Sequence, residues 1–279
     1  MSSPFLGKKA LITGASAGLG EEFALQLADL GVNHFVLTAR RADRLENLKE
    51  CLAAAHPGLK AETISADLAD PVDVAKLTAK MESLGFAPDI VINNAGFGDL
   101  GTFETSEPAK IEAMLAVNVV ALTRLTRWAL PAMLKAKSGW ICNVGSTAGL
   151  LPLPSFAVYG ATKAYVNSFS EALRAELHGS GIFVTALCPG PVETEFGQVA
   201  SRPTSSRQFA PPAFFCVDKA KVVRDTLRAM ARGRGRIIPG LLVRFSMLIV
   251  ESVPRWLLRF VFNRMSGSFR RERALRSTL

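Results

Sequence analysis

Short apolar runs alternate with longer stretches of helical periodicity from the start of the chain to about residue 240. The apolar runs predict strands at 9–13, 34–38, 62–66, 90–93, 140–144, 183–187 and 236–238. Several of these runs are continuous rather than alternating, which is typical of strands buried on both faces of a parallel sheet. The periodic stretches between them predict helices at 18–30, 44–55, 72–84, 108–136 and 156–177.

This order of elements predicts an α/β fold with a doubly wound, Rossmann-like and mostly parallel seven-stranded sheet. Parallel strands joined by right-handed helical crossovers place helices on both faces of the sheet. We expect residues 1–240 to form one such domain, without an internal linker or repeat. The stretch 197–212 is the one long irregular region, rich in Ser, Pro and Thr, and such stretches are often lids or binding loops.

Residues 241–279 depart from the strand–helix rhythm and predict a basic and apolar helical extension, packed on or beside the domain. The apolar segment 237–262 contains the charged residues Arg244, Glu251, Arg255 and Arg259. A membrane-spanning helix needs about 20 largely uncharged residues, so this segment does not qualify. Two interpretations stay open, a peripheral amphipathic helix on a membrane surface or a segment that packs over a substrate pocket.

The composition is that of a globular protein, with 49% hydrophobic and 20% charged residues among 279. The net charge of +9 is uneven, because residues 224–279 contain thirteen arginines and three acidic residues. This asymmetry suggests an anionic partner such as a membrane surface, but arginines alone favour the simpler interpretation of a solvated or self-associating face. No aromatic and basic stripe accompanies the arginines, so we expect no nucleic-acid partner.

The cysteines and histidines suggest no metal site. Cys51, Cys142, Cys188 and Cys216 are scattered without a CxxC pair, and the three histidines lack ligand spacing. This pattern predicts neither disulfides nor metal ligands and favours a reducing compartment. The first residues show no apolar segment after a basic patch, so no signal peptide is predicted. We expect a cytoplasmic protein, with membrane association as a further option.

A glycine-rich turn follows the first predicted strand. Residues 13–20 read Thr-Gly-Ala-Ser-Ala-Gly-Leu-Gly and lead directly into a helix. Glycines here allow a tight turn and let the backbone approach a pyrophosphate at the positive end of the helix. Many turns contain glycine for steric reasons alone, but the position between the first strand and the first helix favours a dinucleotide site.

The end of the second strand indicates which dinucleotide binds. An acidic residue there would bind the ribose hydroxyls of NAD, whereas an arginine accommodates the 2′-phosphate of NADP. Arg40 and Arg41 occupy this position, and the first carboxylate follows only at Asp43. We therefore predict NADP(H), the alternative being that both arginines simply begin a solvated helix.

Tyr159 and Lys163 lie four residues apart in a predicted helix, so their side chains share one face. A phenol with a reference pKa near 10 is a poor base at neutral pH, and a nearby ammonium group lowers that pKa. A Y-x3-K pair alone often occurs by chance in a helix. Here, however, Ser146, Asp67 and the Asn-Asn-Ala-Gly sequence at 93–96 also follow predicted strands, at the edge where doubly wound sheets bind ligands.

Several motifs follow one another in order along the chain: the TGASAGLG turn, Asp67, NNAG, Asn118, Ser146, Tyr159-x3-Lys163 and Pro189-Gly190. Together they resemble the short-chain dehydrogenase/reductase superfamily over about residues 7–240. The resemblance implies Tyr159 as acid and base, Lys163 as the group that lowers its pKa and holds the nicotinamide ribose, Ser146 as the group that polarises the carbonyl, and Asn118 as a water anchor. It also implies a cofactor site that comprises Gly14, Ser16, Ala17, Gly18, Leu19, Gly20, Asp67, Leu68, Asn94, Gly96, Pro189, Val192 and Thr194. Gly145 departs from the pattern, because many members have a second serine there.

The resemblance further implies a homo-oligomer, a dimer or tetramer, and a substrate loop over roughly 193–217. That loop contains Phe196, Phe209, Phe214 and Phe215, and the opposite wall would contain Leu151, Leu153 and Phe156. An apolar pocket of this kind predicts a hydrophobic ketone, aldehyde, sterol or acyl substrate. The phenylalanines could instead be ordinary core residues.

We therefore expect an NADPH-dependent oxidoreductase that reduces a carbonyl or oxidises the corresponding alcohol. Two alternatives stay open: the same scaffold acting as an isomerase, epimerase or dehydratase, and a non-catalytic nucleotide-binding regulator.

Overall fold

A computed structural model describes residues 3–202, 211–254, 256–260 and 262–264. The described residues form seven strands: β1 (Lys9–Thr13), β2 (His34–Ala39), β3 (Lys60–Ser65), β4 (Ile90–Asn93), β5 (Gly139–Val144), β6 (Ile182–Leu187) and β7 (Arg236–Ile237). All pairs are parallel, in the order β3-β2-β1-β4-β5-β6-β7. The predicted doubly wound sheet is confirmed, with the strand order reversing between β1 and β4.

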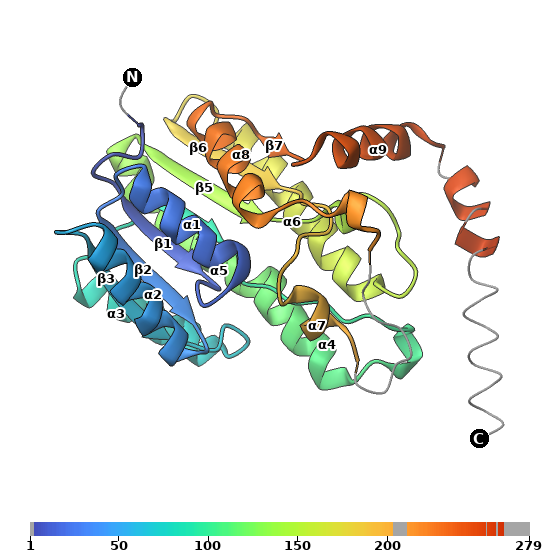
Figure 1. Ribbon diagram of the computed structural model, residues 1–279, viewed down its shortest axis with the longest axis horizontal. Helices are drawn as coiled ribbons and strands as arrows, with labels where there is room; N and C mark the ends of the chain where they lie inside the picture. Colours follow the sequence, from blue (N-terminus) through green and yellow to red (C-terminus); the bar gives the residue numbers. More distant parts are fainter. Residues whose placement is uncertain (1–2, 203–210, 255, 261, 265–279) are drawn as a thin grey trace.

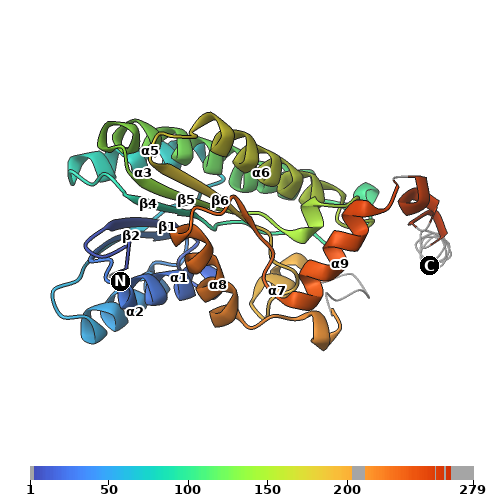
Figure 2. The same cartoon turned by 90° about the horizontal axis from the view of Figure 1, so that it is seen from above.

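Helices cover both faces of this sheet (Figures 1 and 2). The described α-helices are α1 (Gly18–Asp29), α2 (Ala42–Ala55), α3 (Pro71–Ser83), α4 (Pro108–Leu115), α5 (Leu122–Ala136), α6 (Ala157–Glu176), α7 (Phe196–Ala200), α8 (Lys219–Ala231) and α9 (Leu241–Ser252). One face carries α1, α2 and α8, and the other carries α3, α5 and α6. Central strands such as β4 and β5 are buried along their whole length because helices pack on both sides of them.

The structure corrects several predicted boundaries. The predicted helix 108–136 is divided into α4 and α5 by a π-helical segment, Ala116–Ala121, whose wider turn displaces the hydrogen-bond ladder. Strand β3 begins at Lys60, where alternating exposure hid it from a search for continuous apolar runs. The stretch 197–212 is not irregular throughout, since α7 continues to Ala200, and residues 203–210 lie outside the described part of the chain.

Two further segments bear on whether the protein contacts a membrane. The helical stretch Pro108–Ala136 is long and apolar enough to cross a membrane by composition, and among the described helices it alone passes that test. It packs on β4 and β5 as a core helix of the fold, and soluble core helices commonly pass the same test. The predicted C-terminal helical extension is present as α9 and as helical residues at 256–260, which lie beside the domain (Figure 1).

Candidate active site

A cleft of about 520 Å³ opens at the carboxyl ends of the strands, where the strand order reverses. The predicted catalytic residues Ser146, Tyr159 and Lys163 line it. So do most predicted cofactor residues, namely Gly14, Ser16, Ala17, Gly18, Leu19, Arg40, Arg41, Asp67, Leu68, Asn94, Gly96, Pro189, Val192 and Thr194. Residues from six separate segments of the chain therefore meet in one place. Gly20 and Asn118 are not among the lining residues and lie behind the wall.

The glycine-rich turn has the geometry of an anion cradle. Gly14 and Gly18 have φ angles of 66° and 61°, which a residue with a side chain rarely adopts. Ala17 is the N-cap residue of α1 and provides no side-chain hydrogen bond, so the first amide groups of α1 are available to a ligand. Unsatisfied N–H groups and the helix dipole together favour a phosphate at this point.

Gly20 serves the packing of this turn rather than its surface. A Cβ atom at Gly20 would clash with the carbonyl oxygen of Gly14 and with the side chain of Asn94. Asn94 donates from Nδ2 to the carbonyl oxygens of Thr13 and Gly14, at 2.9 and 3.1 Å. Glycine at 20 is therefore needed for the close packing of the turn, and Asn94 braces the turn from behind. The pyrophosphate contact of Gly20 stays a prediction.

The two predicted phosphate-binding arginines differ in their surroundings. Arg41 donates to the hydroxyl of Ser16 at 3.2 and 3.3 Å and pairs with Glu195 at 2.8 Å. Arg44 also pairs with Glu195, at 2.6 Å. Arg40, by contrast, has no acidic partner within the described residues. A 2′-phosphate beside Arg40 would therefore break no described ion pair.

Tyr159 is buried beside Ser146 at the inner end of the cleft. Burial raises the pKa of the Tyr159 phenol to about 12, and a hydrogen bond with Ser146 opposes this shift. Ser146 follows β5, caps the turn Thr147–Gly149 and accepts a hydrogen bond from the Ala148 amide at 3.0 Å. The expected lowering of the phenol pKa is thus wrong for this structure, because burial outweighs the other influences.

Lys163 lies one helical turn beyond Tyr159 but points to the backbone of β5. Its Nζ donates to the carbonyl oxygen of Val144 at 2.7 Å and lies 5.8 Å from the centre of the Tyr159 ring. Burial lowers the pKa of Lys163 to about 8. A Cβ atom at Gly96 would lie 3.2 Å from this Nζ, so glycine at 96 leaves room for the ammonium group.

Asn118 holds the wall of the cleft from inside the π-helical segment. Its Oδ1 accepts from the Phe97 amide at 3.1 Å, and its Nδ2 donates to the Phe97 carbonyl and to Thr162, both at 3.0 Å. Thr162 in turn donates to the Tyr159 carbonyl at 2.7 Å. The side chain thereby connects the NNAG loop to the helix that carries Tyr159. π-Helical turns are frequent at functional sites.

Asn167 is a supporting residue that sequence reasoning missed. Its Nδ2 donates to the Ser146 carbonyl at 3.1 Å, and its Oδ1 lies 3.2 Å from the Cys188 thiol. A Cβ atom at Gly145 would clash with this Oδ1, so the departure at 145 makes room for Asn167. The signal was present, since Asn167 follows Lys163 by four residues on the same helical face.

Aromatic and aliphatic side chains form the wall around Tyr159. The rings of Phe156 and Phe196 lie 5.5 and 5.3 Å from the Tyr159 ring, and Leu153 also lines the cleft. Sequence reasoning did not single out Phe97, Val117 and Val199, which also line the cleft. Phe97 directly follows the NNAG motif, which is the signal that could have found it.

Other predicted pocket residues lie elsewhere. Phe214 and Phe215 pack on each other at 4.7 Å and are not among the lining residues; Phe214 is exposed, and Phe215 packs against the core beneath α1 and α8. Leu151 does not line the cleft either, and Phe209 lies outside the described residues.

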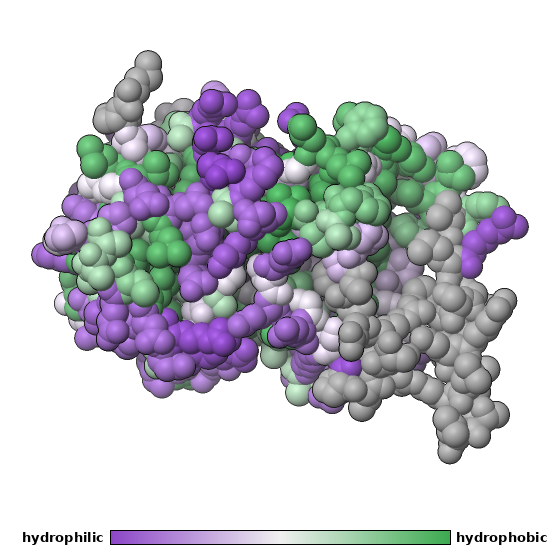
Figure 3. Space-filling model, viewed as in Figure 1, coloured by the Kyte–Doolittle hydropathy of each residue, from purple (hydrophilic) through white to green (hydrophobic). Residues whose placement is uncertain are grey.

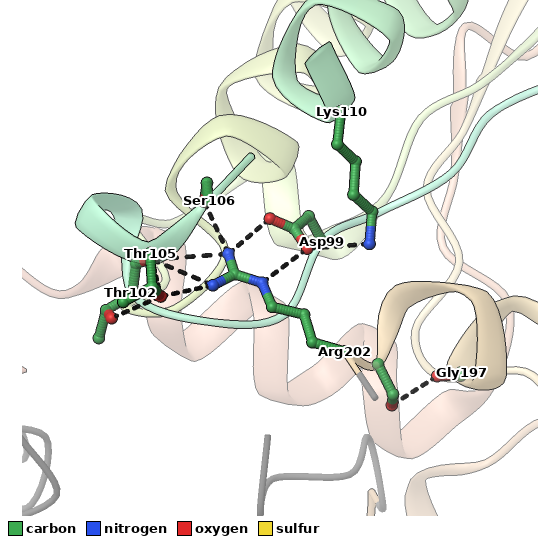
Figure 4. A network of polar contacts seen from close by, with 8 residues as sticks. Asp99, Thr102, Thr105, Ser106, Lys110, Gly197 and Arg202 are labelled. Carbon is green, nitrogen blue, oxygen red and sulfur yellow. Dashed lines mark hydrogen bonds and ion pairs between the residues drawn. The ribbon is translucent and has the colours of Figure 1, made fainter. Parts of the chain in front are cut away.

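An ion-pair network fastens α7 over the cleft (Figure 4). Arg202, two residues after α7, donates to both carboxylate oxygens of Asp99 at 2.8 and 2.5 Å. Lys110 of α4 reaches the same carboxylate at 3.0 Å, and Arg202 also donates to Ser106 at 2.6 Å. Burial disfavours the charge of Asp99, but the hydrogen bonds from Arg202 and Lys110 outweigh it and hold the pKa at about 2.

Fold and cleft together define a class of protein. A parallel sheet with an anion cradle after β1, an unpaired arginine after β2, and a buried Tyr–Ser–Lys group after β5 is a dinucleotide-binding oxidoreductase site. Residues 8–204 match the family described as short chain dehydrogenase, and the chain belongs to that family. The predicted resemblance is confirmed, and with it an enzyme that acts on CH–OH or C=O groups with NADP(H).

Three similar proteins place the chain within this family. It is 38% identical over 193 residues to an NADP-dependent 3-hydroxy acid dehydrogenase of Salmonella typhi, covering 68% of this chain and 75% of that one. It is 28% identical over 281 residues to the very-long-chain 3-oxoacyl-CoA reductase of Bos taurus, covering 98% and 84%. A solved short-chain dehydrogenase of Sphingobium yanoikuyae in complex with NADPH superposes with a TM-score of 0.76 at 32% identity, covering 90% and 95%.

Proposed function

We propose that this enzyme is an NADPH-dependent carbonyl reductase for hydrophobic ketones or aldehydes, and that it oxidises the corresponding alcohols in the reverse direction. The observation that carries the proposal is the position of Tyr159. Its buried hydroxyl lies between a phosphate cradle and an apolar wall formed by Leu153, Phe156 and Phe196.

The cofactor would lie along the strand ends. Amide groups at Gly18 and Leu19 would face the pyrophosphate, and Arg40 would provide the charge for a 2′-phosphate. Asp67 and Leu68 would border the adenine, and Pro189, Val192 and Thr194 would border the nicotinamide. The NADPH complex of the Sphingobium relative supports this choice of cofactor.

The chain's own residues then handle the proton and the carbonyl oxygen. Bound NADPH supplies the hydride to the carbonyl carbon. The Ser146 hydroxyl donates a hydrogen bond to the carbonyl oxygen and stabilises the charge that develops there. Tyr159 donates its proton to that oxygen, which yields the alcohol, and the Lys163 ammonium stabilises the phenolate that results.

The lining of the cleft supports a hydrophobic substrate. Near Tyr159 it is aromatic and aliphatic, and Glu195, the acidic lining residue next to Phe196, is paired with Arg41 and Arg44. The name of the bovine relative specifies a very-long-chain acyl substrate, whereas the Salmonella relative is named for a 3-hydroxy acid. Both names describe oxygen at carbon 3 of an acyl chain, so a hydrophobic 3-oxoacyl compound is our first candidate.

A panel of carbonyl compounds, followed through loss of NADPH absorbance, tests this function, with NADH run alongside. We expect Tyr159→Phe to lower kcat by about 100- to 10,000-fold while NADPH still binds, because a general acid contributes that much. The chain contains only one other tyrosine, so Tyr165→Phe on the same helix is the matched control and should keep full activity.

Full activity in Tyr159→Phe would overturn the mechanism. Turnover restricted to small, highly polar carbonyls would overturn the substrate class while leaving the mechanism intact. Product formation without net loss of NADPH would instead identify an isomerase or dehydratase on this scaffold.

Assembly and location are predictions of the same kind. The family resemblance predicts a dimer or tetramer, and sedimentation analysis of the purified protein would measure its mass. A cytoplasmic location follows from the sequence expectations above, and contact with membranes is argued next.

A further inference from the structure

Helix α9 exposes an apolar stripe to solvent. Its outward positions are Leu241, Leu242, Phe245, Leu248 and Ile249, each between 46% and 86% exposed. At 100° per residue these positions fall within a sector of about 120°, so they form one face of the helix. Figure 3 shows hydrophobic side chains gathered over this helix. A contiguous apolar face of this kind marks an interaction site more often than a solvated surface.

The opposite face of α9 is already in use. Val243 is buried and fills the space beside Gly190, which lines the active-site cleft. Met247 packs against the core on the same side. The helix is therefore anchored to the domain by its inner face, and the exposed stripe is a second apolar face with a fixed orientation.

The apolar surface continues beyond α9. In the helical residues 256–260, Trp256 is 69% and Phe260 54% exposed. The Arg264 guanidinium lies 5.1 Å from the centre of the Phe260 ring. Tryptophan and arginine beside aliphatic residues are typical of segments that lie at a membrane–water interface.

A basic groove of about 930 Å³ borders the apolar stripe, between α8, β7 and α9. Leu241, Phe245 and Leu248 form part of its wall. Six of its lining residues are cationic and two are acidic: Lys221, Arg228, Arg232, Arg234, Arg236 and Arg244 against Asp225 and Glu251.

The acidic residues of the groove are already paired. Asp225 pairs with Lys221 at 3.1 Å, and Glu251 pairs with Arg236 at 2.8 Å. Three arginines, at 232, 234 and 244, thus have no acidic partner within the described part of the chain. They form a net positive border along the apolar stripe.

We propose that this combined face docks the protein peripherally on a bilayer that contains anionic phospholipids. We define the docking surface as the apolar positions 241, 242, 245, 248, 249, 256 and 260 together with the unpaired arginines 232, 234 and 244. The apolar side chains would insert among the acyl chains, and the arginines would pair with lipid phosphates. The proposal is independent of the reaction catalysed.

Charge selects a membrane over a second copy of this chain. A symmetric dimer presents the same patch from both partners, so it would concentrate the unpaired arginines of both copies in one interface. Like charges in such an interface cost free energy, whereas an anionic bilayer neutralises them. The contact of Val243 with Gly190 also places the docking surface next to the cleft, where a lipophilic carbonyl compound could pass from the membrane.

Co-sedimentation of the full-length protein with phosphatidylcholine vesicles, with and without phosphatidylserine, tests the proposal. We expect binding to the anionic vesicles that weakens as salt shortens the Debye length from about 10 Å at 0.1 M to about 3 Å at 1 M. The double variant Phe245→Ser/Leu248→Ser should lower the partition coefficient at least about tenfold, because two large apolar side chains no longer enter the lipid. Arg232→Gln/Arg234→Gln should lower it roughly 25-fold on anionic vesicles only.

Matched controls lie elsewhere on the surface. Leu6 and Val72 are 62% and 55% exposed, close to the 61% and 62% of Phe245 and Leu248. Leu6→Ser/Val72→Ser and Arg124→Gln/Arg127→Gln remove the same kinds of group and should leave vesicle binding unchanged. Unchanged NADPH binding in every variant verifies the fold.

Three results would overturn the proposal. The protein could stay in the supernatant with every vesicle, or the docking-surface variants could bind as well as the controls. A dimer that the docking-surface variants convert to a monomer would assign the face to a second copy instead.

Discussion

At the scale of single residues, the site buries two titratable groups whose pKa values move in opposite directions. Burial raises the pKa of Tyr159 to about 12 and lowers that of Lys163 to about 8. Both shifts disfavour charge in a poorly solvated site. The raised pKa keeps the Tyr159 hydroxyl protonated through neutral pH, which is the state that reduction of a carbonyl needs. A buried ammonium beside it lowers stability. Under the proposed mechanism, this ammonium group would stabilise the phenolate in return.

Lys163→Met measures that loss of stability. At pH 7 we expect the variant to be inactive and, without cofactor, about 1–3 kcal/mol more stable, because no buried ammonium must be desolvated. Between pH 8 and 10.5 the unfolded wild type still holds the lysine proton that the folded protein has released. Wild-type stability therefore rises in this range, and the advantage of the variant shrinks. Urea unfolding across the pH range checks this expectation.

The control for this measurement is Lys80→Met, at an exposed lysine in the last turn of α3. Its effect on stability should stay small at every pH. A Lys163→Met variant less stable than wild type at pH 7 would contradict the argument.

At the scale of elements, the C-terminal end of α7 is held over the cleft by polar contacts with residues 99 and 100. The Leu100 amide donates to the Ala200 carbonyl at 2.8 Å, and Arg202 binds the buried carboxylate of Asp99. At the other end of α7, the Phe196 ring packs on the Tyr159 ring at 5.3 Å. We infer that the Asp99–Arg202 pair acts as a positioning pair, because it determines where the aromatic wall lies relative to the acid.

Arg202→Leu should raise KM for a hydrophobic carbonyl several-fold while lowering kcat less. The reason is that α7 loses its ion pair with Asp99, whereas Tyr159 keeps its hydrogen bond with Ser146. The single variant should also lower the stability by at most about 3 kcal/mol, since it leaves the buried carboxylate of Asp99 paired with Lys110 alone. The pair stabilises the fold at all pH values above about 4, and that contribution is lost as the pH falls towards 2, where Asp99 becomes protonated. Steady-state kinetics and urea unfolding measure both effects.

A double variant, Asp99→Asn/Arg202→Gln, removes both charges and should regain much of the stability while KM stays raised. Arg224→Gln, at an exposed arginine of α8, is the control with unchanged KM. Unaltered KM in both Arg202 variants would show that the pair only stabilises the fold.

At the scale of the whole molecule, the cleft joins the two halves of the sheet. Lining residues within 14–19, 39–41 and 66–69 border one part of it, and lining residues within 144–163 and 189–199 border the other. A ligand that contacts both halves stabilises the folded state by mass action. The docking surface lies beyond β7, next to the second half, so membrane contact and cofactor binding use separate faces.

NADPH at 100 times its Kd should stabilise the protein by about 2.7 kcal/mol, which raises Tm by roughly 5–10 °C for a chain of this size. Arg40→Ala should reduce the shift from NADPH and leave the smaller shift from NADH unchanged, because Arg40 is the unpaired cation at the 2′ position. Thermal melts with each dinucleotide check this, with Arg124→Ala as the control. If NADPH shifted the Tm of wild type and Arg40→Ala equally, the 2′-phosphate site would be assigned to Arg41 instead.

The sequence alone determined the fold and the identity of the chemical groups. Apolar runs separated by periodic stretches specify strands and helices locally, and the ends of parallel strands must meet at one edge, so Ser146, Tyr159 and the glycine-rich turn could be brought together without a structure. The spacing of Tyr159 and Lys163 likewise follows from the pitch of a helix.

Only the tertiary structure decided how these groups are charged and supported. The pKa values of Tyr159 and Lys163 depend on burial by segments distant in sequence, and no local pattern encodes that. The same holds for Asn167 beneath Ser146, for the Asp99–Arg202 pair, which joins positions 103 residues apart, and for the outward face of α9. Periodicity shows that a helix has an apolar side, but only packing decides whether that side is covered.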